Sequence, residues 1–99
     1  MAKYKIVVDK DLQDIVPAYI ESKKAELVSL SAMQAAGNLE ELRKSGHKLA
    51  GSGGGYGFDR LSEIGRQLET AARTSDVPGV ASALAGMKDY LENLEVVYE

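Results

Sequence analysis

The sequence predicts an all-α protein: an antiparallel four-helix bundle in up-down-up-down order, preceded by a short extended or helical N-terminal lead-in over residues 1–10. Three observations predict it. Apolar residues recur at three- and four-residue spacing, the two prolines fall where helices would begin, and short glycine-containing or polar breaks separate the periodic stretches. The bundle is expected over about residues 11–98 of a single domain spanning residues 1–99.

Length and composition limit the class of protein. Ninety-nine residues, 44% of them hydrophobic, suffice for one modest core. The absence of cysteine excludes disulfides and thiolate metal sites, and no apolar run approaches the ~20 residues of a membrane span. A formal charge of −3, from 12 basic and 15 acidic residues, argues against nucleic-acid binding. We therefore expect a cytoplasmic monomer that binds neither membranes nor nucleic acid.

The first helix is expected from about Asp11 to Ala36, with Pro17 able to separate a short initial turn from the rest. Gly37-Asn38 then ends this helix and caps the next. Residues 3–8 have strand-like composition, but nothing else in the chain is expected to pair with them, so an extended lead-in is the prediction. The apolar face of the first helix comprises Leu12, Ile15, Val16, Tyr19, Ile20, Leu27 and Leu30.

Three further helices follow, each with a regular apolar stripe that is expected to be core. Thr74-Ser75-Asp76 supplies the break and the N-cap before the last of them. Tyr56 and Phe58, at the turn between the second and third helices, are expected to pack in the core as well. The stripes are Leu39, Leu42, Gly46, Leu49 and Gly53, then Leu61, Ile64, Leu68 and Ala71, and finally Val80, Leu84, Met87, Leu91, Leu94 and Tyr98.

The single histidine lies beside an unusual run of glycines. His47 falls within the second helix, and residues 51–57 read Gly-Ser-Gly-Gly-Gly-Tyr-Gly. Each glycine inside a helix costs roughly 0.5–1 kcal/mol relative to alanine, which indicates that something must approach the backbone closely there. At ~100° per residue, His47 lies ~120° from the centre of the inward stripe. We therefore expect an imidazole that solvent can reach.

The neighbours of His47 on its helix face suit an imidazole that carries a phosphoryl group. Arg43 and Lys44 lie one turn before it, and Gly51 and Gly54 lie one and two turns after it. Neutral imidazole is a nucleophile, cations offset the ~1.5–2 negative charges of a phosphate, and missing side chains leave room for another protein's active site. The alternative is an ordinary surface histidine.

A carboxylate on the third helix is expected to reach this histidine. His47 and Glu69 are each eleven residues from Phe58, so a hairpin at Phe58 brings them to the same level. Glu69 is then expected to accept a hydrogen bond from one ring nitrogen and leave the other as the nucleophile. Arg73, one turn on, adds a cation to the same face; for both residues the alternative is a solvated surface charge. The seam between the helices is lined by small residues, Ala50, Gly65 and Ala72.

These residues make the chain resemble a histidine-containing phosphotransfer (HPt) domain. The resemblance covers about residues 11–98, including the number and lengths of the helices. The family motif has a histidine, glycines four and ten residues later, and a Leu-Glu pair in the next helix. The matching positions are His47, Gly51, Gly57 and Leu68-Glu69, together with Ser52, which is also common in the family.

Ala50 is the departure from that pattern, because the family usually has lysine three residues after the histidine. The resemblance implies that this lysine helps to neutralise the phosphoryl group. Its loss either weakens transfer or is covered by Lys48, Lys44 or Arg43, and the sequence leaves these alternatives open.

The resemblance implies a phosphorelay carrier rather than an enzyme. His47 would accept a phosphoryl group from an aspartyl phosphate on a response-regulator receiver domain, or from a sensor histidine kinase, and pass it to a receiver. Docking is expected at the glycine-rich end of the helix, where three glycines remove obstacles and Ser52 can donate a hydrogen bond. These glycines are Gly51, Gly54 and Gly55. We expect no cofactor or metal of the chain's own, since the receiver would bring Mg²⁺.

Other functions stay open at this stage. A phosphorylation-independent adaptor would keep the bundle and bind a receiver or kinase domain without accepting phosphate. A single histidine without cysteine argues against a metal-dependent enzyme. A nucleotide loop at residues 51–57 is disfavoured, because no strand precedes it and no Gly-Lys-Ser/Thr follows. The sequence identifies neither the cognate kinase and receiver nor the signal, and it allows both an independent protein and a part of a larger kinase.

Overall fold

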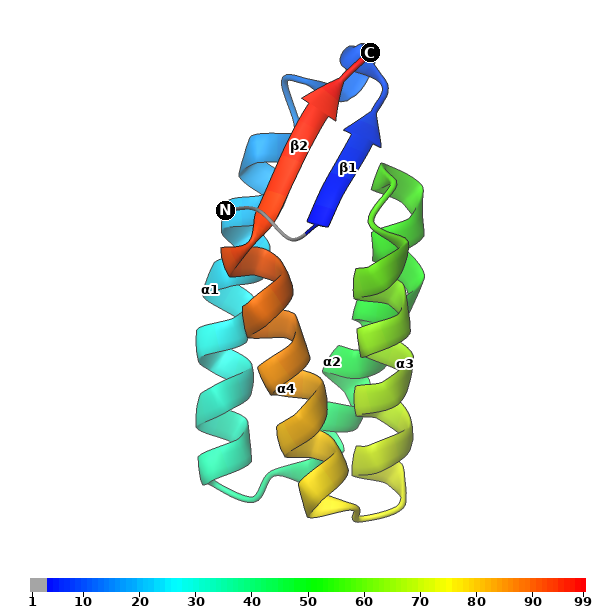
Figure 1. The fold of residues 1–99 in the computed structure, drawn as a ribbon. Coiled ribbons are helices and arrows are strands. Elements are labelled where there is room, and N and C mark those ends of the chain that lie inside the picture. Colours follow the sequence, from blue (N-terminus) through cyan, green and yellow to red (C-terminus); the bar gives the residue numbers. More distant parts are fainter. Residues whose placement is uncertain (1–3) are drawn as a thin grey trace.

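Four antiparallel helices make up most of the structure (Figure 1). The computed structural model describes residues 4–99, apart from the side chain of Tyr56. Each helix runs opposite to the next, and α1 also packs against α4, which closes the bundle. The predicted all-α, up-down-up-down bundle is confirmed. The helices are α1 (Val16–Ala35), α2 (Leu39–Ser52), α3 (Asp59–Arg73) and α4 (Val77–Glu92).

Helix ends lie where the sequence places capping residues. Asn38 caps α2, since its side-chain oxygen accepts a hydrogen bond from the backbone nitrogen of Glu41 at 3.3 Å. Asp76 caps α4 in the same way through the backbone nitrogen of Gly79 at 3.0 Å. Gly37, after α1, has a φ of +70°, a conformation that glycine adopts without strain. The predicted breaks between helices are therefore confirmed.

The first helix begins later than the predicted Asp11, but the short initial turn that Pro17 was expected to be able to separate is present. Residues 10–12 form a separate 3₁₀ turn, η1 (Lys10–Leu12), and α1 starts at Val16. Pro17 lies in the first turn of α1 and has no N–H to donate to the carbonyl of Gln13, so the helical hydrogen-bond ladder cannot run back through this point. Ile15 consequently precedes the helix and is exposed, contrary to its predicted place on the apolar face.

The predicted stripes of α2 and α3 meet in one continuous core. Their large apolar side chains are buried except that of Leu39, which is partly buried, and Phe58 at the turn between them is buried too. Complete burial of one such side chain contributes about 1.5–3 kcal/mol. The prediction for Tyr56 lies outside the described side chains. The fully buried residues include Val16, Leu30, Leu42, Leu49, Phe58, Ile64, Leu68 and Met87.

The two ends of the chain pair in a parallel two-stranded sheet, which the sequence analysis did not predict. The strands are β1 (Tyr4–Val8) and β2 (Leu94–Tyr98), with Tyr4 opposite Leu94 and Val8 opposite Tyr98. The lead-in is therefore a strand, and the expectation that nothing would pair with it is wrong. The extension of the last helix to residue 98 is also wrong.

α4 ends at Glu92, and Asn93 caps its last turn. The side-chain nitrogen of Asn93 donates to the backbone oxygen of Asp89 at 2.8 Å, and the backbone nitrogen of Asn93 donates to the same oxygen at 3.1 Å. The following Leu-Glu-Val-Val-Tyr is rich in β-branched and aromatic residues, which favour a strand. Leu94 and Tyr98 keep the helical spacing of the α4 stripe, so the spacing alone does not indicate where the helix ends and the strand begins.

The sheet covers one end of the bundle, beside the turn between α2 and α3 (Figure 1). Val8 is only 3% exposed, and its side chain lies 3.9 Å from where a Cβ of Gly57 would be. The hydroxyl of Tyr4 donates to Asp89 of α4 at 2.6 Å, and its ring lies 5.0 Å from that of Tyr90. The strands therefore seal the core at this end.

Candidate functional site

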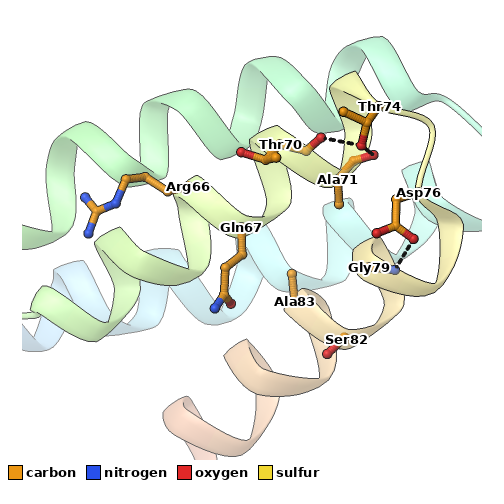
Figure 2. Close-up of a pocket in the computed structure, with 9 residues that line it drawn as sticks. All are labelled: Arg66, Gln67, Thr70, Ala71, Thr74, Asp76, Gly79, Ser82 and Ala83. Atoms are coloured by element: carbon orange, nitrogen blue, oxygen red, sulfur yellow. Dashed lines mark hydrogen bonds between the residues drawn. The ribbon is translucent and has the colours of Figure 1, made fainter.

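A groove of about 480 Å³ between α3 and α4 carries no sign of a ligand site (Figure 2). Two of its polar residues, Thr74 and Asp76, already serve the helix ends. The hydroxyl of Thr74 donates to the carbonyl of Thr70 at 2.9 Å, and Asp76 accepts from Gly79. Over residues 4–99 no group of three or more His, Asp or Glu side chains could hold a metal ion. None of the described helices is long and apolar enough to cross a membrane.

His47 stands on the outer surface of α2, and 75% of its side chain is exposed. Because residues of a helix are spaced by ~100°, the burial of Leu42 and Leu49 turns His47 outward. The predicted accessible imidazole is confirmed.

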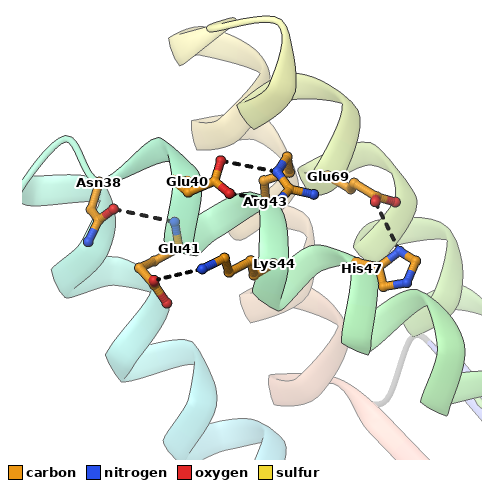
Figure 3. A network of polar contacts seen from close by, with 7 residues as sticks. All are labelled: Asn38, Glu40, Glu41, Arg43, Lys44, His47 and Glu69. Atoms are coloured by element: carbon orange, nitrogen blue, oxygen red, sulfur yellow. Dashed lines mark hydrogen bonds and ion pairs between the residues drawn. The ribbon is translucent and has the colours of Figure 1, made fainter.

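The ring is held by one contact from the neighbouring helix (Figure 3). Its Nδ1 lies 3.0 Å from Oε2 of Glu69 on α3, whose side chain is 23% exposed. A carboxylate only accepts hydrogen bonds, so in the neutral ring this contact assigns the proton to Nδ1 and the lone pair to Nε2. Nε2 points away from Glu69 and forms no hydrogen bond with the residues that the structure describes. The predicted contact between Glu69 and the ring is present.

Two glycines allow α2 and α3 to approach backbone to backbone beside this contact. A Cβ added to Gly46 would lie 2.7 Å from the backbone nitrogen of Glu69. A Cβ added to Gly65 would lie 2.8 Å from the carbonyl oxygen of Gly46, and closer still to the backbone nitrogen of Ala50. Ala72, also predicted to line the seam, is buried.

The glycine run after His47 has an inner and an outer part. Gly53 is buried, and a Cβ there would lie 2.8 Å from the carbonyl oxygen of Phe58, so this glycine serves the packing of the hairpin itself. Gly51 and Gly55 face open space, and Gly54 has only ordinary contacts. The predicted place of Gly53 on the inward stripe is confirmed, and only the outer glycines leave space for an outside molecule.

The two cations that precede His47 are paired with acids of the preceding turn (Figure 3). Arg43 donates two hydrogen bonds to Glu40, at 2.7 and 3.2 Å, and Nζ of Lys44 lies 3.6 Å from Glu41. The hydrogen bond with Glu40 raises the pKa of Arg43, and the negative charge of Glu69 adds to the effect. Arg43 in turn lowers the pKa of Glu40, chiefly through the same hydrogen bond.

Three other cations on α2 and α3 are exposed and form no ion pair with a described residue: Lys48, Arg66 and Arg73. Arg66 was not predicted as a site residue. The signal for it is its position three residues before Glu69, on the same side of α3 as Arg73.

Ser52 lies at the glycine-rich end of α2, as expected, but its hydroxyl does not face the same side as His47. Its hydroxyl faces α1, 3.5 Å from the hydroxyl of Tyr19 and 3.4 Å from the carbonyl oxygen of Leu49. Five residues along a helix correspond to a rotation of ~140° from His47, which carries Ser52 away from the histidine face. The expected hydrogen bond from Ser52 to a docked protein is therefore not supported.

Comparison with known proteins gives a family match at the level of sequence. The family model described as Hpt domain matches residues 8–96, a stretch that contains all four helices, His47 and Glu69. No curated protein and no solved structure matches the chain.

Proposed function

Because the chain belongs to the Hpt domain family, whose members take part in phosphotransfer in two-component phosphorelays, we propose that His47 is the phosphoacceptor of such a carrier. The observation that supports this most directly is an imidazole that is 75% exposed and held through Nδ1 alone, at 3.0 Å from Glu69. The donor is the aspartyl phosphate of a receiver domain or a sensor histidine kinase, and the acceptor is a response-regulator receiver.

The transfer step uses the free lone pair on Nε2. Nε2 attacks the phosphorus of the acyl phosphate, an N–P bond forms, and the P–O bond to the receiver's aspartate breaks, with its electron pair leaving on the carboxylate. The ring becomes positively charged and keeps its proton on Nδ1. The carboxylate of Glu69 stabilises that charge, so Glu69 acts as a positioning residue through the ring. The reverse step delivers the phosphoryl group to the next aspartate.

Charge neutralisation in this proposal differs from the family pattern. A phosphoryl group brings ~1.5–2 negative charges, and Ala50 offers none of the help that a lysine would give. Arg43 and Lys44 are engaged with Glu40 and Glu41. We assign the supporting role to Lys48 and Arg73, which have no ion pair with a described residue, and to Mg²⁺ that the receiver supplies. Gly51 and Gly54 leave space for that receiver.

The test is transfer of label from a phosphorylated receiver in the presence of Mg²⁺. We expect an acid-labile, base-stable label on the chain, and we expect His47→Gln to abolish it while circular dichroism shows an intact bundle. Lys88→Gln, an exposed substitution on α4, is the matched control and should keep the label. Binding of several receivers without any transfer would contradict the proposal and favour the adaptor, the function to which the missing lysine at Ala50 points.

A further inference from the structure

The backbones of α2 and α3 come close together at two glycines next to the functional pair. Gly46 immediately precedes His47, and the atoms that a Cβ on Gly46 would strike are the backbone nitrogen of Glu69, at 2.7 Å, and its Cα, at 3.1 Å. Gly65 lies one turn before Glu69. A Cβ added to Gly65 would lie 2.8 Å from the carbonyl oxygen of Gly46. Each glycine therefore sits beside one member of the pair and against the backbone of the opposite helix.

A side chain at either glycine would change the distance between the carboxylate and the ring. Ordinary contacts of a Cβ begin at 3.4 Å, so an alanine at Gly46 requires the helices to separate by more than half an ångström from the present 2.7 Å. The hydrogen bond from His47 to Glu69 is already 3.0 Å long. N–H···O hydrogen bonds usually span ~2.7–3.2 Å, so a separation of that size would weaken this one.

We propose that Gly46 and Gly65 are positioning residues, which set the reach of Glu69 to His47 and thereby the ring nitrogen that carries the proton. With the contact made, Nδ1 is protonated and Nε2 is free to react. With the helices pushed apart, the ring loses its partner and the tautomers redistribute. The effect of the tautomer on phosphotransfer rests on the proposed function. The effect of the two glycines on the tautomer does not depend on that function.

The alternative is that Gly46 and Gly65 serve helix packing alone. The chain contains another helical glycine whose substitution controls for the general effect of replacing glycine by alanine. Gly86 is also a glycine inside a helix, on α4, and a Cβ there meets nothing within 4 Å. Gly86→Ala should leave the ring unchanged. A further control is Glu69→Ala, which removes the carboxylate without placing a Cβ between the helices.

The experiment is ¹⁵N NMR of the imidazole in the free protein, and since His47 is the only histidine its ring signals need no assignment. In the unaltered chain we expect mainly the Nδ1–H form. Gly46→Ala and Gly65→Ala should each lower the ratio of Nδ1–H to Nε2–H about fivefold, the change that corresponds to a hydrogen bond of about 1 kcal/mol. In a Glu69→Ala background the same substitutions should have no further effect.

Unchanged tautomer ratios in folded Gly46→Ala and Gly65→Ala would overturn the proposal, and so would an additional change in the Glu69→Ala background. If both variants lose their helical circular dichroism, the glycines are required for folding and the positioning role is likewise rejected. No receiver is needed for this measurement. A failed labelling experiment and a failed tautomer experiment therefore reject different statements.

Discussion

At the scale of single residues, the carboxylate of Glu69 decides which ring nitrogen of His47 is available. Glu69 reaches the ring from a different helix, at 3.0 Å, and its own side chain is mostly covered. A partly covered carboxylate beside an exposed imidazole forms a stronger hydrogen bond than two fully solvated groups would. Glu69 is therefore expected to affect the reactivity of His47 more than the stability of the fold.

Glu69→Ala should slow phosphotransfer to His47 about tenfold, because the ring loses both its fixed tautomer and the charge that stabilises the phosphorylated imidazolium. The free energy of unfolding should fall by no more than about 1 kcal/mol, the contribution of the hydrogen bond that is lost. Rapid-quench labelling and urea unfolding measure the two quantities. Glu63→Ala, an exposed acid on the same helix, is the control. Equal transfer rates in Glu69→Ala and the unaltered chain would remove Glu69 from the site.

Tyr90 provides a second test at this scale, because its hydroxyl is buried without a hydrogen-bond partner among the described residues. The residue is 1% exposed, and burial raises its pKa to about 12. Unfolding restores a pKa near ~10, so the unfolded chain loses this proton first as the pH rises. Stability should therefore fall by about 1.4 kcal/mol per pH unit between pH ~10 and ~12 on account of Tyr90.

Tyr90→Phe should remove the loss of stability between pH ~10 and ~12 that comes from ionisation of Tyr90 in the unfolded chain. At pH ~8 it should leave the free energy of unfolding unchanged or raise it by up to about 1 kcal/mol, since no partner is left unsatisfied. Urea unfolding of the variant and the unaltered chain, at pH ~8 and between pH ~10 and ~12, measures both effects. A loss of stability at pH ~8 would show that the hydroxyl has a favourable contact after all.

The residue contacts that could be predicted from the sequence are those fixed by helix geometry. His47 and Glu69 are equally far from Phe58, so an antiparallel hairpin brings them together whatever the remaining chain does. Which ring nitrogen faces the carboxylate depends on side-chain torsions, which no spacing encodes. The pairing of Arg43 with Glu40 was missed for another reason: both a bound phosphate and a neighbouring acid attract a cation, and the acid is already present in the same helix.

At the scale of elements, the strands were the part that sequence reasoning could not supply. A parallel pair needs partners far apart in the chain, and Tyr4 and Leu94 lie at opposite ends of it. Local periodicity carries no information about such a pairing. The helices, in contrast, are determined by spacing and by caps such as Asn38 and Asp76, which act within a few residues.

Val8→Ala should lower the free energy of unfolding by about 1.5–2 kcal/mol, because it removes two buried methyl groups under the sheet. Val7, its neighbour on β1, points to solvent, so Val7→Ala is a matched control that should cost almost nothing. Urea unfolding measures both. Equal effects at the two positions would contradict the view that the sheet seals the core.

At the scale of the whole molecule, charge is unevenly divided between the two halves of the bundle. Residues 39–73, which hold α2 and α3, carry six cationic and five acidic side chains, whereas the remaining residues carry six and ten. The segment that holds His47 thus has a formal charge of +1, from six basic and five acidic residues, in a protein whose formal charge is −3. Such a division favours the approach of a phosphorylated partner in one orientation.

The double substitution Arg66→Glu and Arg73→Glu should slow association with a phosphorylated receiver about threefold to tenfold at low salt, and the difference should shrink as salt is added. Stopped-flow measurement of binding tests this. Lys88→Glu changes an exposed charge on α4 and is the control. Similar rates for all three proteins would show that charge does not guide the encounter.

The pairing of β1 with β2 also has a consequence for how the protein is made. Residues 4–8 are synthesised before the four helices, but the only strand they pair with in the described structure, residues 94–98, is synthesised after them. Until β2 is synthesised, β1 has no strand to pair with, and the core beneath Val8 stays open to solvent. Because pairing segments so distant in the chain carries a loop-closure entropy cost, we expect the sheet to form last during folding.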